Sequence, residues 1–143
     1  MSLVAFDSGS VPASFIWMLS SGARTKGDLV WVSAGSSGPV DVAVSSSATV
    51  RVAAVACHDI ASGAKGLYQL SGSCCVTVPS ATYTDARGLE TDGGVIEDSG
   101  AAFGNTAAIG AQSNTDFAAV MGTQASVTSC LCCLHGQPDL STT

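Results

Sequence analysis

The chain has 143 residues, which is enough for one domain that buries a core of its own. Five Lys and Arg against eleven Asp and Glu give a net charge of −6, which argues against nucleic acid, because phosphates are bound by clustered cations. No apolar run reaches the ~18 residues of a membrane span, and no basic region precedes the short run at residues 15–19. We therefore expect no nucleic acid, no membrane and no signal peptide, and folding in a reducing cytosol.

Charged residues make up only 11% of the chain, whereas ordinary soluble domains have about 25%. Ser, Thr, Gly and Ala take their place, and these small, weakly hydrated groups are poor at preventing association. We interpret this as a chain whose surface is covered by partners in its working state. The alternative is a monomer with a Ser- and Thr-rich exterior.

The chain divides into three parts. Residues 1–13 mix apolar and turn residues without a period, and we interpret them as a possible N-terminal arm. Residues 14–135 are typical of a single β-domain, and residues 136–143 form a C-terminal tail without a packing pattern. For both ends, fraying is the alternative to an arm that grips a neighbour.

Within the domain the dominant period is two, as in half-buried strands. Val40, Val42 and Val44, for example, share one face of their segment. Gly, Ser, Asp and Pro bound the segments, with predicted turns at residues 71–72 and 99–100 among others. The segments that we predict as strands are residues 28–32, 40–44, 48–52, 66–70, 75–78, 94–96 and 126–134.

Helical periodicity is almost absent. The best candidate, residues 115–121, is one or two turns at most. About eight short strands at a spacing of 8–12 residues predict an all-β fold. We expect a jelly-roll-like β-sandwich or a small β-barrel, with extended N- and C-terminal arms.

Catalytic groups are scarce. The chain has two histidines, and a thiol nucleophile with its base and orienting acid could be assembled from Cys57, His135 and Asp59. His58 is next to Cys57 and would point to the opposite face of a strand. There is no Gly-x-Ser-x-Gly elbow, no glycine-rich loop that opens a helix and no opposed pair of carboxylates. We predict that the protein is not an enzyme and needs no cofactor.

Six cysteines are present, five of them in two tight clusters at residues 74–75 and 130–133. On a strand, Cys130 and Cys132 share a face about 7 Å apart, and His135 or Cys57 could complete a zinc shell with them. No second pair of cysteines at zinc-site spacing exists, so we expect no metal. Buried, reduced thiols are the favoured interpretation, and a disulfide formed after release from the cell is the alternative.

The middle of the chain carries a recognisable order of short motifs. They are Lys26-Gly27-Asp28-Leu29-Val30, then the segment from His58 to Gly72 with Asp59-Ile60-Ala61-Ser62-Gly63-Ala64-Lys65-Gly66, then Val76-Thr77-Val78-Pro79-Ser80-Ala81, then Gly93-Gly94-Val95-Ile96, and a strand near Ala108-Ile109-Gly110-Ala111. This order resembles a family of small bacteriophage proteins that decorate or cement the outside of capsids, and the resemblance covers roughly residues 26–112. The cysteine clusters are not part of that pattern, and residues 1–25 match nothing in it.

The resemblance implies a virion protein that folds in the host cytoplasm and then binds the outer surface of a capsid. Its partners would be the major capsid protein and further copies of itself, as a homodimer or homotrimer at symmetry axes. Repetition over many copies lets each contact be modest. The alternative is another virion module, such as a tail, spike or receptor- or glycan-binding adhesin.

Contact residues can be suggested from charge and loop position. The loops at residues 33–39, 58–65 and 81–92 are candidates for contact with a partner. An acidic protein can use its few cations on a carboxylate partner, although solvated surface charge is the alternative for each. The predicted partner-binding residues are Arg24, Lys26, Arg51, Lys65 and Arg87.

Overall fold

A computed structural model describes residues 12–44, 51–92, 94–103, 116–135 and 138–139. All regular secondary structure in these ranges is β-strand, so the all-β prediction is confirmed. None of the described residues forms a helix long and apolar enough to cross a membrane. The strands are β1 (Ser14–Leu19), β2 (Leu29–Gly35), β3 (Gly38–Ala43), β4 (Arg51–Ala56), β5 (Lys65–Tyr83), β6 (Arg87–Asp92), β7 (Val95–Ala102), β8 (Ala118–Val120), β9 (Gln124–His135) and β10 (Pro138–Asp139).

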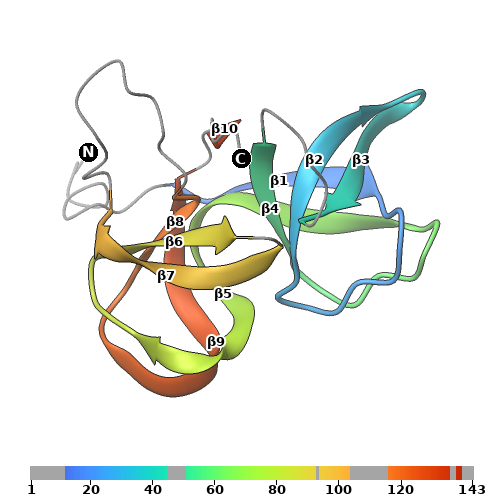
Figure 1. Ribbon diagram of the computed structural model, residues 1–143. Helices are drawn as coiled ribbons and strands as arrows, with labels where there is room; N and C mark the ends of the chain where they lie inside the picture. Colours follow the sequence, from blue (N-terminus) through green and yellow to red (C-terminus); the bar gives the residue numbers. More distant parts are fainter. Residues whose placement is uncertain (1–11, 45–50, 93, 104–115, 136–137, 140–143) are drawn as a thin grey trace, which may run out of the picture.

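Five strands close into a small barrel in the order β4-β2-β3-β1-β5, with β5 pairing back to β4 (Figure 1). The pair β1–β3 is parallel, with Leu19 opposite Val40, and the other pairs of the ring are antiparallel. Closure removes the free edges that an open sheet would present. Of the two expected architectures, the structure therefore contains the small barrel.

The second half of β5 leaves the barrel and begins a second sheet in the order β5-β9-β8-β6-β7. Figure 1 shows the two halves side by side, with β5 running through both. The short strand β10 pairs with the beginning of β4, at Val52 and Arg51, whereas β5 pairs with the end of β4. Two residues of the predicted C-terminal tail thus lie in the sheet, whereas residues 1–11 of the predicted N-terminal arm lie outside the described residues.

The barrel interior is filled by alternate residues of four strands. Val30 lies opposite Ala54, and Tyr68 lies opposite both Ile16 and Ala56, so these side chains project to the same side. Ile60, from the loop before β5, closes the same cluster. The buried members are Met18, Val30, Ala54, Ala56, Ile60 and Tyr68.

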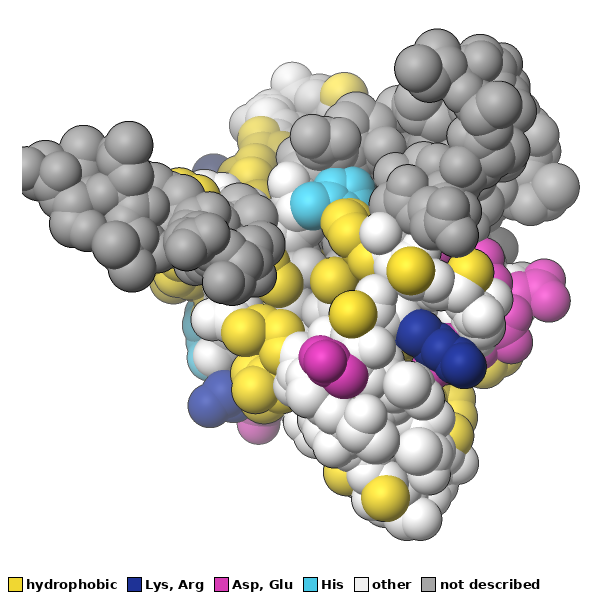
Figure 2. All heavy atoms as spheres, turned by 90° about the vertical axis from the view of Figure 1, so that its left-hand side faces the viewer, with side chains coloured by type: hydrophobic (Ala, Val, Ile, Leu, Met, Phe, Trp, Pro, Cys, Tyr) yellow, Lys and Arg dark blue, Asp and Glu magenta, His cyan; other side chains and the backbone are white. Residues whose placement is uncertain are grey.

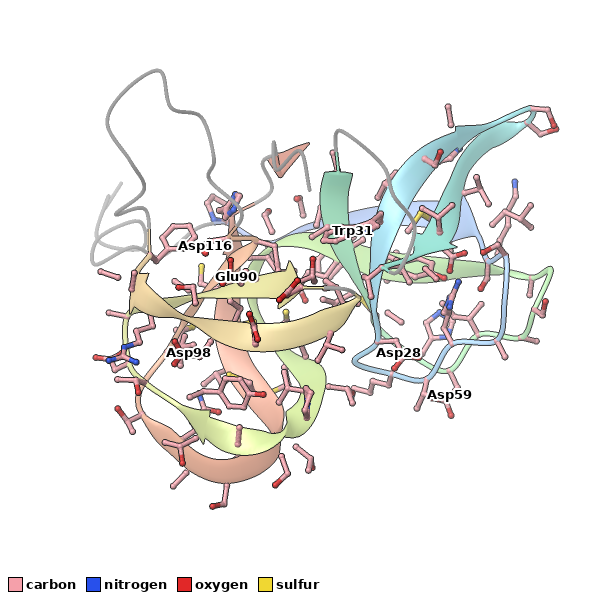
Figure 3. All side chains as sticks on the ribbon, viewed as in Figure 1. Asp28, Trp31, Asp59, Glu90, Asp98 and Asp116 are labelled. Carbon is pink, nitrogen blue, oxygen red and sulfur yellow. The ribbon has the colours of Figure 1, made fainter. Side chains whose placement is uncertain are left out.

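A larger core lies between the outer face of the barrel and the second sheet. Trp31 and Ala53 are opposite one another, one residue out of phase with the interior pair, and therefore face outward from the barrel. Figure 3 shows Trp31 between β2 and the second sheet. The larger core also contains Leu29, Val55, Val76, Val78, Tyr83, Leu89, Ile96, Phe117, Ala118, Val120, Cys130, Cys132 and Leu134.

The longest strand, β5, has 19 residues and corrects the prediction of two strands separated by a turn at residues 71–72. Gly72 has φ +92°, and a Cβ at this position would lie 2.8 Å from the Cα of Ala13. The glycine therefore makes an irregularity inside a continuous strand, where the register between β1 and β5 shifts, instead of a chain reversal. This continuity fixes the second sheet to the barrel.

Three further predictions differ from the structure. The predicted turn at residues 99–100 lies within β7, and the predicted loop at residues 81–92 contains the end of β5 and all of β6. The helical candidate at residues 115–121 is wrong, because residues 118–120 form β8. In each case pairing with a distant strand decides the conformation, which local periodicity cannot reveal.

Candidate interaction surface

An apolar strip lies on the outer face of β1. Phe15, Trp17 and Leu19 are 52%, 63% and 40% exposed, whereas Met18 between them is 1% exposed. This is the alternation of a strand whose other side faces a filled barrel. Large aromatic side chains on a surface are the groups most often found at the centre of protein interfaces. We define Phe15, Trp17 and Leu19 as the β1 strip.

A cavity of about 200 Å³ opens beside the strip. Its walls are the end of β1, from Trp17 to Leu19, and the β2–β3 hairpin from Gly35 to Val40. Among the described residues that line it, Lys65 carries the only charge. The strip and this cavity together offer an apolar surface with a recess and one cation at its rim.

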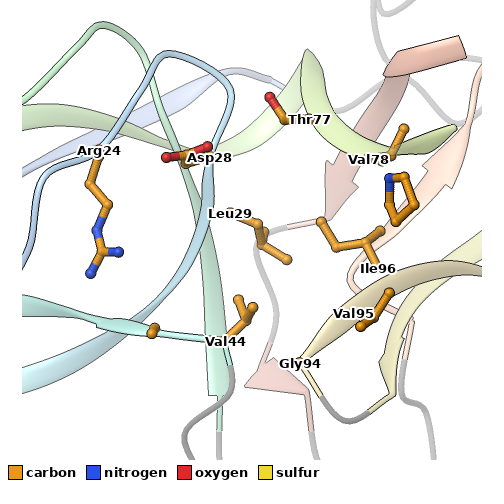
Figure 4. Close-up of a pocket in the computed structure, with 11 residues that line it drawn as sticks. Arg24, Asp28, Leu29, Val44, Thr77, Val78, Gly94, Val95 and Ile96 are labelled. Carbon is orange, nitrogen blue, oxygen red and sulfur yellow. The ribbon is translucent and has the colours of Figure 1, made fainter.

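A second hollow, of about 470 Å³, lies between the barrel and the second sheet (Figure 4). Leu29 and Val44 line it from the barrel side, and Val95 and Ile96 from β7. Arg24 and Asp28 stand at its barrel end in Figure 4. The guanidinium of Arg24 is already bound to Asp41, so this hollow presents mainly aliphatic surface.

Asp41 is the centre of a polar network inside the barrel. Its side chain is fully buried, and its Oδ2 accepts hydrogen bonds from Arg24 Nε at 2.7 Å and from the Tyr68 hydroxyl at 2.7 Å. Its Oδ1 accepts from the backbone N–H of Ser21 at 2.6 Å and from the Ser21 hydroxyl at 2.7 Å. The Ser20 hydroxyl lies 3.2 Å from Oδ2. The valine-rich strand thus turns its single acid, not its valines, toward the barrel interior.

The network keeps this carboxylate ionised. Burial alone would raise the pKa of Asp41, but the hydrogen bonds from Arg24, Ser21 and Tyr68 outweigh it and hold the pKa well below its usual range. Burial, together with the bond to Asp41, raises the pKa of Tyr68 to about 12, so its hydroxyl remains the donor. The charge is therefore compensated where it is buried.

Acid should weaken the fold through this group. Because the pKa of Asp41 is lower in the folded than in the unfolded chain, its stabilisation is complete above about pH 4 and is lost as pH falls below that value. We expect the free energy of unfolding, measured with urea between pH 7 and pH 3, to fall more steeply for the wild type than for Asp41→Asn. Equal slopes below about pH 4 would contradict this assignment.

The loops that carry the recognisable motifs close the end of the barrel. Backbone hydrogen bonds of 2.8 Å join Arg24 and Ile60 in both directions, and the N–H of Lys26 donates to the Asp59 carboxylate at 2.9 Å. A Cβ on Gly66 would lie 2.3 Å from Cδ1 of Ile60, so only glycine at this position leaves room for the Ile60 side chain. The motif residues thus hold two loops of the same chain together.

The five predicted partner-binding cations have different environments. Lys26 and Lys65 are exposed, and Lys65 lies at the cavity beside the β1 strip. Arg24 is bound to Asp41, and Arg87 lies 3.8 Å from Asp98 with its side chain 44% exposed. The side chain of Arg51 lies outside the described residues. Their role in binding stays a prediction.

The residues considered for chemistry each have other contacts. His135 Nε2 is 2.5 Å from the carbonyl of Asp116, and His58 Nε2 accepts from the N–H of Leu67 at 3.1 Å. Cys130 and Cys132 are fully buried in the larger core, and Cys57 is half-buried. Among the described residues, no group of three or more His, Cys, Asp or Glu is placed to hold a metal ion.

Charge is thinly spread over the surface. Figure 2 shows a face on which apolar and uncharged side chains predominate. In Figure 3 the labelled acids Glu90, Asp98 and Asp116 lie with the second sheet, and Asp28 and Asp59 lie at the loops of the barrel.

Comparison with known proteins gives a likeness in fold. The chain is similar to the structure described as "The crystal structure of head fiber gp8.5 N base in bacteriophage phi29", with a TM-score of 0.55 and 12% sequence identity. The match covers 88% of this chain and 97% of that one. At this identity the likeness shows a shared fold. No family model matches the chain, and no curated protein is similar to it in sequence.

Two features of the site were missed by the sequence analysis. The β1 strip was recognised only as a short apolar run, because its inward and outward residues are equally apolar. Burial of Asp41 gave no local signal, because its partners come from residues 20–24 and from Tyr68. An alternation of aromatic residues at positions 15 and 17 was the one sign that could have indicated an exposed strand face.

Proposed function

We propose that this chain is a structural protein of a bacteriophage virion, which binds the outer surface of the capsid and decorates or cements the major capsid protein. The observation that carries the proposal is the fold shared with a phage head-fibre base over 88% of the chain. The order of motifs between residues 26 and 112 supports the same assignment independently. The protein would fold in the host cytoplasm and act without catalysis or a cofactor.

The β1 strip is the surface that we assign to the partner. It combines exposed aromatic and aliphatic side chains with a recess of about 200 Å³, into which a side chain of the partner could insert. Lys65 at the rim, and Lys26 farther along the barrel loops, would meet carboxylates of the partner and guide its approach. Further copies of the chain on the capsid would add avidity to a contact of modest size.

Binding to capsids tests the proposal. Purified chain is mixed with undecorated capsids of the encoding phage, and the bound fraction is measured by co-sedimentation over a range of concentrations. We expect saturable, stoichiometric binding. We expect Leu19→Ser or Trp17→Ser to weaken it about tenfold or more, the usual effect of truncating an interface centre.

The chain offers a matched control. Leu131 on β9 is 40% exposed, as Leu19 is, but lies outside the strip, so Leu131→Ser should leave capsid binding unchanged. Failure of the wild-type chain to bind capsids would refute the proposed function. Equal losses for Leu19→Ser and Leu131→Ser would refute only the assignment of the strip.

A second candidate is a receptor- or glycan-binding module of the virion. The observation in its favour is the 63% exposure of Trp17, since exposed indole rings also stack on other ligands. A glycan array probed with wild-type chain and with Trp17→Ser distinguishes the two functions. Binding to a defined glycan that depends on Trp17 would favour the adhesin.

A further inference from the structure

Two cysteines face each other across the junction of β5 and β9. Cys74 and Cys132 are register partners in this antiparallel pair, so their side chains project from the same side of the sheet. Directly opposite residues in antiparallel strands have Cα atoms about 4.5–5.5 Å apart. Disulfides span Cα separations of about 4.4–6.8 Å, so the backbone need not move for these two residues to be joined.

The two thiols differ in burial and in the direction of their pKa shifts. Cys132 is fully buried in the larger core, while Cys74 is half-buried and packs against that core from its edge. A hydrogen bond from Cys132 lowers the pKa of the Cys74 thiol against the opposing effect of burial. The same hydrogen bond, together with burial, raises the pKa of Cys132. Cys74 is therefore both the more accessible thiol and the one that ionises first.

None of the other register pairs between β5 and β9 joins two cysteines. Cys75 lies opposite Leu131, Cys133 opposite Ser73 and Cys130 opposite Val76. Cys57 follows β4, and its thiol lies 3.9 Å from the carbonyl of Val55. Cys74 and Cys132 are both thiols in the structure, so this pair is reduced there.

We propose that Cys74 and Cys132 form a thiol–disulfide site, which small disulfide oxidants convert into a bond between β5 and β9. The Cys74 thiolate attacks one sulfur of the oxidant, forms a mixed disulfide and releases one thiolate. Cys132 then attacks the sulfur of Cys74, which forms the internal disulfide and releases the second thiolate. The two protons lost by the protein end on the two released thiolates, so one oxidant molecule is reduced to two thiols.

The bond would close a loop that contains β6, β7 and β8. It would tie the second sheet together at its join to the barrel and restrict the unfolded chain over that whole segment. A chain that is reduced in the cytosol would be locked after it reaches an oxidising medium. This inference does not depend on the proposed function, because it requires only the two strands.

The test uses the purified, reduced full chain and oxidised glutathione. We expect intact mass to fall by two hydrogen atoms, titratable thiols to fall from six to four, and peptide mapping to recover residues 74 and 132 in one linked peptide. The melting temperature should rise by about 5 °C or more. Cys132→Ser should form no internal disulfide and should accumulate the glutathione adduct on Cys74.

Cys133→Ser is the matched control, because it changes the neighbouring buried cysteine on the other face of β9 and should oxidise as the wild type does. If Cys132→Ser does not fold, Cys74→Ser at the more exposed position must also abolish the disulfide. Six free thiols after oxidation would overturn the proposal. A linked peptide that joins any other pair would overturn it as well. Capsid binding is measured separately, so its failure would leave these results unaffected.

Discussion

Replacing Asp41 by alanine is expected to lower the free energy of unfolding by about 3–5 kcal/mol, the usual cost of removing one partner of a buried ion pair. The carboxylate accepts from Arg24, Tyr68 and the backbone of Ser21 inside the barrel. Alanine would leave these donors unsatisfied where water has little access. The same loss would loosen the loop at residues 20–24, which the network holds against β3.

Urea-induced unfolding, monitored by circular dichroism, measures this loss. The chain contains a matched pair of arginines as a control. Arg24→Ala removes the buried partner and should cost about 2–4 kcal/mol, whereas Arg87→Ala removes a contact of 3.8 Å at the surface and should cost less than about 1 kcal/mol. Similar losses for the two arginine variants would show that the Asp41 network contributes little.

Trp31→Ala is the second substitution with a large expected effect, about 3–5 kcal/mol. Trp31 is 1% exposed and lies between the barrel and the second sheet, and its Nε1 donates to the carbonyl of Val44 at 3.2 Å. Removal of the ring would leave a cavity between two sheets that are joined through β5 and cannot collapse freely. We expect the second sheet to lose protection from hydrogen exchange before the barrel does.

Tryptophan fluorescence gives a direct check, because Trp17 and Trp31 are the only tryptophans of the chain. Trp31→Ala retains the exposed Trp17, so emission should be that of an indole in water even in the folded state. Trp17→Ala retains the buried residue, and its stability should remain within about 0.5 kcal/mol of the wild type. A large stability loss for Trp17→Ala would mean that the β1 strip is part of the core.

Local pattern was sufficient for some strands. The predicted strand at residues 28–32 overlaps β2, and the one at residues 126–134 lies within β9, because both segments are rich in β-branched and apolar residues and are bounded by turn residues. The prediction from local pattern failed at Gly72, since a glycine with positive φ occurs both in turns and in irregular strands. It also failed at residues 118–120, where pairing with β6 and β9 selects a strand.

The candidate site was harder to predict than the fold. The loops and the cations were predicted to bind a partner from their positions in the sequence alone. The structure shows Arg24 bound to Asp41, and the loop at residues 58–65 hydrogen-bonded to residues 20–26. The outward face of β1 could not be separated from its inward face, since Phe15, Trp17 and Leu19 alternate with Ile16 and Met18. Only closure of the barrel decides which of them meet solvent.

The place of β9 in the sheet has a consequence for synthesis of the protein. This strand comes late in the chain, yet it pairs with residues 71–83 of β5 and, through β8, connects β6 and β7 to the rest. While the ribosome is still making residues 124–135, the strand that lies between β5 and β8 is missing. The second sheet therefore cannot form, and the edge of β5 that pairs with β9 stays unpaired. Such distant pairing makes folding slow and leaves an unpaired strand exposed to other nascent chains. The half of the protein that holds the larger core is thus completed only after translation has passed β9.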